Sequence, residues 1–196
     1  MERPAVKVFS LLVAWGLLAG MGQAWAVDNG TDLTGQIIAH LGQVPERAQP
    51  FHEQKDMAAL THPLLSSGVL LFHRPAYLEK NTQAPRPEKL VIDGSMVSIQ
   101  RGAGSVHNVP LSQSPALALL VTTMRAPLEG DMASLTHDYT LSAQGDLGAW
   151  TLNMAPLSPQ AVHLVRLVVL KGRNNAIQSL KIVQANGDVQ TLTLDP

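Results

Sequence analysis

KLVIDGSMVSIQ, residues 89–100, is typical of a β-hairpin. Two short apolar runs, 89–92 and 96–100, flank the dipeptide Asp93-Gly94. An Asp-Gly pair between such runs is one of the strongest short hairpin signals, because glycine readily adopts the positive φ of a tight turn. The stretch therefore predicts two antiparallel strands joined by a short turn.

Further strand-like segments lie on both sides of this hairpin. They cover residues 47–55, 69–72, 77–82, 106–111, 138–143, 150–154, 162–170, 177–184 and 189–194. The connections in the C-terminal half contain turn residues such as Gly145, Gly148 and Asn186-Gly187. Parallel strands need long crossovers, so short connections indicate antiparallel neighbours. We expect one α+β domain built on an antiparallel meander.

Helical patterns occupy two other regions. Apolar residues recur at spacings of three and four across 31–44, as in Leu33, Ile37 and Leu41. Pro115 suits the first turn of a second helix over 116–125, and 127–135 predicts a further short helix. Residues 57–65, around His62-Pro63, indicate a turn or a short helix.

The segment 162–170 is apolar on both faces apart from His163 and Arg166. A sheet wetted on one side would alternate apolar and polar residues. Two explanations remain open. The segment is a fully buried central strand, or one of its faces lines an apolar pocket beneath the helices.

The first 26 residues have the pattern of a secretory signal peptide. Arg3 and Lys7 precede a largely apolar run over 8–21, and Ala24-Trp25-Ala26 supplies a small-x-small cleavage pattern. The run is shorter than the roughly 20 apolar residues that span a bilayer. We expect cleavage near Ala26, a single mature domain over residues 27–196, and a periplasmic location if the cell is a Gram-negative bacterium.

Composition excludes several classes of function. Without the signal, 12 of the 14 basic and 14 of the 15 acidic side chains remain, a net charge of about −2 that provides no basic footprint for nucleic acid. The chain has no cysteine, which excludes disulfides and thiolate metal sites. Neither a nucleophile elbow nor a zinc-protease or phosphate-loop motif is present. We expect no catalytic residue, no cofactor and no metal.

Arg74 is the polar residue with the most suggestive position. It follows the apolar strand 69–72 and precedes Pro75. A guanidinium fixed there can reach backbone carbonyls or a carboxylate. An ordinary solvated arginine at a strand end fits the sequence equally well.

The order of these parts resembles the LolA family of periplasmic lipoprotein carriers. The resemblance rests on an N-terminal helix, then Pro63-Leu64, Ser67-Gly68 and the run 71–75 (LFHRP), then the hairpin at 90–94 and the last hairpin at 185–188. It implies a curved antiparallel sheet forming an incomplete barrel, with helices as a lid over an apolar cavity. It also implies that Arg74 latches the lid.

The resemblance further implies a non-enzymatic, monomeric carrier that shields the acyl chains of a lipoprotein or other lipidated cargo. An inner-membrane donor complex and an outer-membrane acceptor would be its partners. On this basis we expect the cavity lining to consist of Leu70, Phe72, Leu117, Leu120, Val121, Met124, Trp150, Leu152, Met154, Leu164, Val168 and Leu180. The alternative is an envelope scaffold or sensor that uses the same half-barrel to bind a protein partner.

Overall fold

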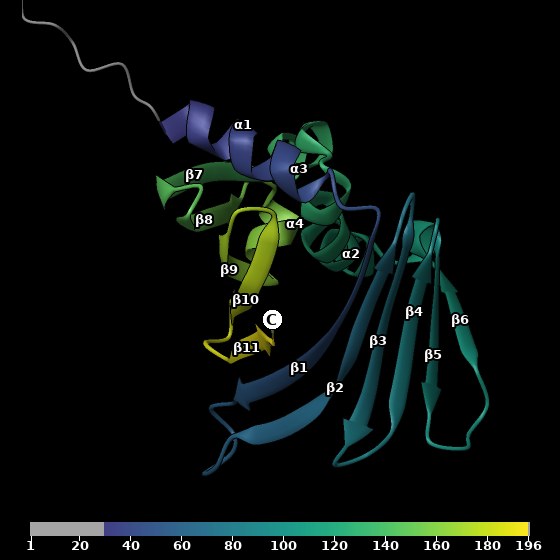
Figure 1. Ribbon diagram of the computed structural model, residues 1–196. Helices are drawn as coiled ribbons and strands as arrows, with labels where there is room; N and C mark the ends of the chain where they lie inside the picture. The colour runs from purple at the N-terminus through teal and green to yellow at the C-terminus, as the bar shows by residue number, and fades with distance from the viewer. Residues whose placement is uncertain (1–29, 196) are drawn as a thin grey trace, which may run out of the picture.

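The computed structural model describes residues 30–195, and all eleven of their strands belong to one antiparallel sheet (Figure 1). Its strand order is β6-β5-β4-β3-β2-β1-β11-β10-β9-β8-β7. Strands that follow one another in the chain therefore pair, except β6 and β7, and the remaining pair is β1 with β11. The sheet is not closed, because β6 and β7 form its two edges. The predicted antiparallel meander is confirmed, while the proposed signal peptide lies outside the described residues.

The strands are mostly short. They are β1 (Glu46–Asp56), β2 (Leu64–His73), β3 (Tyr77–Ala84), β4 (Glu88–Asp93), β5 (Met96–Arg101), β6 (His107–Pro110), β7 (Tyr139–Asp146), β8 (Ala149–Pro156), β9 (Val165–Arg173), β10 (Ala176–Gln184) and β11 (Val189–Leu194). In the predicted hairpin, Asp93 of β4 is the register partner of Met96 of β5. Gly94 in the turn has a φ of 53°, a value that favours glycine.

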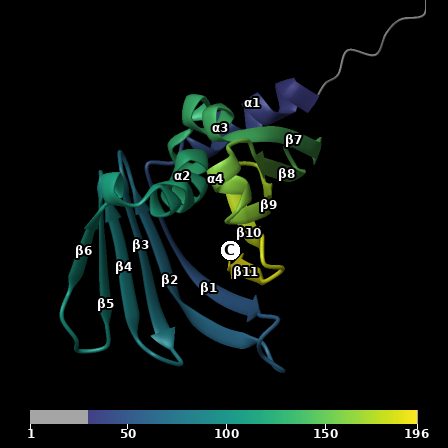
Figure 2. The ribbon, with the colours of Figure 1, turned by 180° about the vertical axis from the view of Figure 1, so that it is seen from behind.

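The helices are α1 (Gly30–Leu41), α2 (Pro115–Glu129), α3 (Met132–Asp138) and α4 (Pro159–Val162), with a 3₁₀ turn η1 (Leu111–Gln113) before α2. Figures 1 and 2 show them gathered at one end of the bent sheet, between strands β1–β6 and strands β7–β10. The side chain of Ser114 accepts a hydrogen bond from the amide of Leu117, which caps the N-terminus of α2. Gly130 ends the same helix with a φ of 75°.

Three local predictions differ from the structure. Pro127 does not begin a new helix but lies in the last turn of α2, where its fixed φ is compatible with the helix and its missing N–H removes a single intrahelical bond. Residues 162–164 are not strand, because the short helix α4 precedes β9, which begins at Val165. The segment 57–65 is a turn whose last residues, Leu64 and Leu65, already belong to β2.

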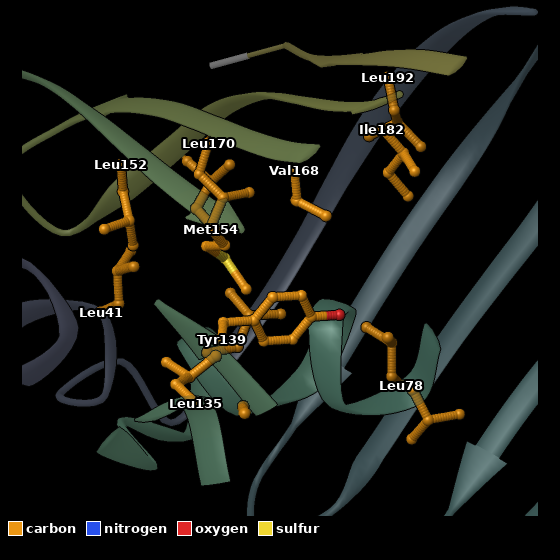
Figure 3. Packing of buried hydrophobic residues seen from close by; sticks show 14 of the residues in the cluster. Leu41, Leu78, Leu135, Tyr139, Leu152, Met154, Val168, Leu170, Ile182 and Leu192 are labelled. Atoms are coloured by element: carbon orange, nitrogen blue, oxygen red, sulfur yellow. The ribbon is translucent and has the colours of Figure 1, made fainter. Parts of the chain in front are cut away.

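The core lies between the helices and the concave face of the sheet. Figure 3 shows Tyr139 near the centre of this cluster, with Met154 extending towards it from the sheet and Leu152 lying next to Leu41 of α1. On β9, Val168 and Leu170 are buried, whereas Leu167 and Val169 on the other face are half-buried. One face of this strand therefore points into the interior beneath the helices.

Candidate functional site

An apolar cavity lies between α2 and the sheet. Its lining residues come from six strands and one helix: Arg47, Gln49, Leu70, Phe72, Leu78, Thr123, Met124, Pro127, Leu128, Leu170, Ile177, Leu180, Leu192 and Leu194. The space that admits the centres of water-sized spheres is about 40 Å³. This is room for a few water molecules. Small-molecule pockets usually measure about 300–1,000 Å³, so the cavity is closed in this conformation.

The residues expected in the lining fall into three groups. Leu70, Phe72, Met124 and Leu180 line the cavity. A second group is packed in the surrounding core without lining the cavity, and it comprises Leu117, Val121, Trp150, Leu152, Met154 and Val168. Leu120 and Leu164 are instead 38% and 40% exposed. Leu120 lies on the outer side of α2. Leu164 lies before the first residue of β9, so the alternation of buried and exposed side chains along that strand does not determine its direction.

Several lining residues were not anticipated from the sequence. Leu192 and Leu194 alternate with threonines along β11, and this period-two pattern alone indicates which face is buried. Leu78 had no comparable signal. It lines the cavity because it pairs with Phe72 across β2 and β3, a relationship that only the register establishes.

Arg74 joins the ends of two helices. One of its terminal nitrogens donates a hydrogen bond to the carbonyl oxygen of Gly42, directly after α1, and the other donates to that of Glu129, the last residue of α2, at 3.1 Å. The last carbonyls of a helix lack intrahelical partners and carry partial negative charge. A cation at this position therefore stabilises both helix ends against β2.

Arg125 is a second anchor, which sequence reasoning missed. Its Nη1 donates to the carbonyl oxygens of Gly94 at 2.7 Å and Ala76 at 3.4 Å, both in turns of the sheet. Its Nε forms an ion pair with Glu129 Oε1 at 2.8 Å, one helical turn along α2. Burial raises the pKa of the Glu129 carboxyl, and the nearby Arg125 and Arg74 oppose this rise. Two arginines thus hold α2 over the cavity.

A pair of hydroxyl groups lies against the buried side of α2. Thr123 Oγ1 donates a hydrogen bond to the carbonyl oxygen of Leu119 at 2.7 Å, and Thr123 Oγ1 is also hydrogen-bonded to the hydroxyl of Tyr139. Burial raises the pKa of the Tyr139 hydroxyl, and its bond with Thr123 opposes this. Because both hydroxyls are satisfied, the helix presents an apolar surface to the cavity.

The cavity has one polar wall, formed by Arg47 and Gln49 of β1. Arg47 donates from Nη2 to the carbonyl oxygen of Asn175, while its buried Nε has no acceptor among residues 30–195. Burial lowers the pKa of Arg47. Gln49 Nε2 donates to the carbonyl oxygen of Asp195 at 3.1 Å. A buried donor without an acceptor costs about 1–3 kcal/mol of stability.

This architecture defines a class of proteins in which an open antiparallel sheet and a helical cover enclose an apolar cavity. The chain belongs to the family described as outer membrane lipoprotein carrier protein LolA-like, whose model matches residues 22–195. The resemblance seen in the sequence is therefore confirmed. No helix among the described residues is both long and apolar enough to cross a bilayer.

Two solved structures match this chain over most of its length. A LolA superfamily protein from Nitrosomonas europaea is 11% identical, with a TM-score of 0.43, over 85% of this chain and 91% of its own. A DUF1329 family protein from Desulfovibrio piger is 10% identical, with a TM-score of 0.34, over 84% of this chain and 89% of its own. No curated protein gives a significant match to the sequence.

Proposed function

We propose that this protein is a non-enzymatic periplasmic carrier, which shields the acyl chains of a lipoprotein or another lipidated molecule between the inner and outer membranes. The observation that carries the proposal is the apolar cavity beneath α2, a helix held in place by the side chains of Arg74 and Arg125. Aliphatic walls suit acyl chains, because nothing in them requires a hydrogen bond from the ligand.

Loading requires a rearrangement of α2, because the closed cavity is too small for an acyl chain. Burying a chain of about 16 methylenes is worth about 13 kcal/mol at ~0.8 kcal/mol each. Displacing α2 breaks the hydrogen bonds that Arg74 and Arg125 donate to carbonyls and exposes buried side chains such as Leu119 and Val121. The acyl chain must replace these lost contacts, which favours closure and release when the cargo leaves.

The proposed partners follow from this cycle. A donor complex in the inner membrane would supply the cargo, and an acceptor at the outer membrane would receive it. The protein would act between them as a monomer, since the cavity is formed within one chain. Opening of α2 would expose the cavity at the donor, and closure through Arg74 and Arg125 would favour release at the acceptor.

Native mass spectrometry of the protein purified from its own periplasm tests the proposal. We expect a chain that begins near Val27 and carries an additional mass, which lipid extraction resolves into an acylated species. Denaturing spectra of the same sample provide the mass of the chain alone. An unliganded mass, together with no uptake of a fluorescent fatty acid, would contradict the proposal.

A scaffold that binds a protein partner is the second candidate. It is favoured by Leu64 and Leu65, which are 51% and 63% exposed at the start of β2. Both leucines line a wide, open groove away from the helices. Under this alternative, Leu64→Ser with Leu65→Ser would abolish partner binding, and the cavity beneath α2 would hold no lipid.

A further inference from the structure

Among the described residues that line the cavity, Arg47 alone is charged. It lies opposite Phe72 in the register of β1 and β2, so an apolar ring and a guanidinium are neighbours on the concave face. No carboxylate among residues 30–195 forms an ion pair with it. A cation without an acidic partner therefore lies at the edge of an apolar site.

The donors of Arg47 are largely unused. A guanidinium has five N–H groups in a planar fork, and the carbonyl oxygen of Asn175 accepts from one terminal nitrogen. The buried Nε has no acceptor in the described part of the chain. Such a fork matches the two oxygens of a carboxylate or a phosphate.

The sheet is incomplete beside Arg47. Pairing of β1 with β11 begins at Phe51, so residues 46–50 have no strand neighbour on that side. The side chains of Arg47 and Gln49 cross this opening to the carbonyl oxygens of Asn175 and Asp195. A charged group at this place could remain in contact with water while an attached chain enters the cavity.

We propose that Arg47 binds an anionic oxygen group of the cargo, a carboxylate or a phosphate adjacent to the acyl chain. The chain lies on the apolar wall formed by Leu70, Leu180 and Leu192, and the anion lies at the fork of Arg47. This inference rests on the proposed carrier function and specifies the chemical class of its cargo. An acyl group joined only to neutral esters or amides would leave the guanidinium without its counter-charge.

Two matched ligand pairs test the inference, measured by displacement of an apolar fluorescent dye from the mature protein. Dodecanoate is compared with its methyl ester, and monododecanoyl glycerol phosphate with monododecanoyl glycerol. We expect the anionic member of at least one pair to bind about tenfold more tightly, the change produced by one charge-assisted hydrogen bond. The pair that shows the difference identifies carboxylate or phosphate.

Three variants complete the experiment. Arg47→Gln should bring the anionic-to-neutral affinity ratio close to one, and Arg47→Lys should retain part of the ratio. Arg101→Gln is the control, since Arg101 is exposed and paired with Glu88 at the far end of β5. Thermal unfolding of each variant establishes that it is folded.

Each other outcome contradicts the inference in a distinct way. An unchanged ratio in Arg47→Gln would overturn it. If that unchanged ratio comes with an equal loss of neutral and anionic binding, Arg47 acts only through its bond to Asn175. Equal affinities within both pairs in the natural protein would overturn the anionic specificity and leave the carrier function intact. Binding of neither member of either pair would overturn both.

Discussion

The backbones of Gly42 and Gly130 are in direct contact, so that a Cβ atom at position 42 would lie 2.8 Å from the Cα of Gly130. Gly42 follows α1 and Gly130 ends α2, so the C-terminal ends of two helices meet there. This approach brings the carbonyl oxygens of Gly42 and Glu129 within reach of the same guanidinium, that of Arg74. The glycine pair is therefore a structural requirement of the proposed latch.

Gly42→Ala should separate the two helix ends. Because backbone atoms cannot yield as a flexible side chain would, we expect a loss of about 1–3 kcal/mol in the free energy of unfolding. Gly35→Ala is the matched control, since a Cβ there meets nothing within 4 Å and alanine favours the interior of α1. Urea unfolding of both variants measures the difference. Equal stability of the two would show that the ends of α1 and α2 separate without cost.

Removal of the latch should slow the release of cargo. Arg74→Leu loses both bonds to the helix ends, so the open state becomes more favourable relative to the closed one. We expect cargo to bind at least as tightly and to pass more slowly to acceptor vesicles, as followed with a fluorescent acyl ligand. Arg125→Leu should act in the same direction, because Arg125 ties α2 to Gly94.

Arg166→Leu is a suitable control for these two variants. Arg166 is exposed on β9 and donates to the carbonyl oxygen of Ala185 at 3.2 Å, away from α2. The Arg166→Leu variant should release cargo at the same rate as the natural protein. A normal release rate in Arg74→Leu would contradict the role proposed for Arg74.

Local patterns predicted the strands of this fold well. The Asp93-Gly94 turn and the alternation that ends in Leu192 and Leu194 are encoded within a few neighbouring residues. The pairing of β1 with β11 joins the two ends of the described chain, and no local signal encodes it. The role of Pro127 was not encoded locally either. A proline usually marks the start of a helix, but Pro127 lies within α2 and forms part of the cavity wall.

The site was less predictable than the fold. The position of Arg74 before Pro75 marked it as a candidate, but its acceptors lie 32 and 55 residues away in the chain. Arg125 and Arg47 gave no signal, because an arginine in a helix or near a strand end is ordinary. Their roles depend on which turns and strands fold against them.

Filling the cavity should block cargo. Leu180 of β10 pairs with Leu170 and Leu192 in the register, and all three line the cavity. Leu180→Trp places an indole where an acyl chain would lie, at a cost of about 1–3 kcal/mol in stability from overpacking. We expect loss of fatty-acid uptake, with Leu120→Trp on the exposed side of α2 as the control. Undiminished uptake by Leu180→Trp would place the cargo elsewhere.

The carboxylate of Glu53 should make stability depend on pH. Glu53 is 4% exposed, and each of its oxygens accepts a bond from Lys80 Nζ at 2.8 Å. Burial raises the pKa of this carboxyl, but Lys80 and the hydroxyl of Ser66 outweigh it, so the pKa is lower than the ordinary value of 4.5. The folded state then binds fewer protons than the unfolded state. This stabilisation is present above about pH 4.5 and is lost as the pH falls through the lowered value.

Glu53→Gln tests this dependence. It leaves the partly buried ammonium of Lys80 without a counter-charge, so we expect a loss of about 3–5 kcal/mol at pH 7. The difference from the natural protein should shrink at low pH, where Glu53 is protonated as well. Lys55→Met is the control, because Lys55 is 42% exposed and lies 3.9 Å from Glu53, and its loss should cost less than about 1 kcal/mol. Urea unfolding at several pH values measures all three proteins. An equal loss in Glu53→Gln at pH 7 and at low pH would assign its effect to packing, because charge would then make no difference.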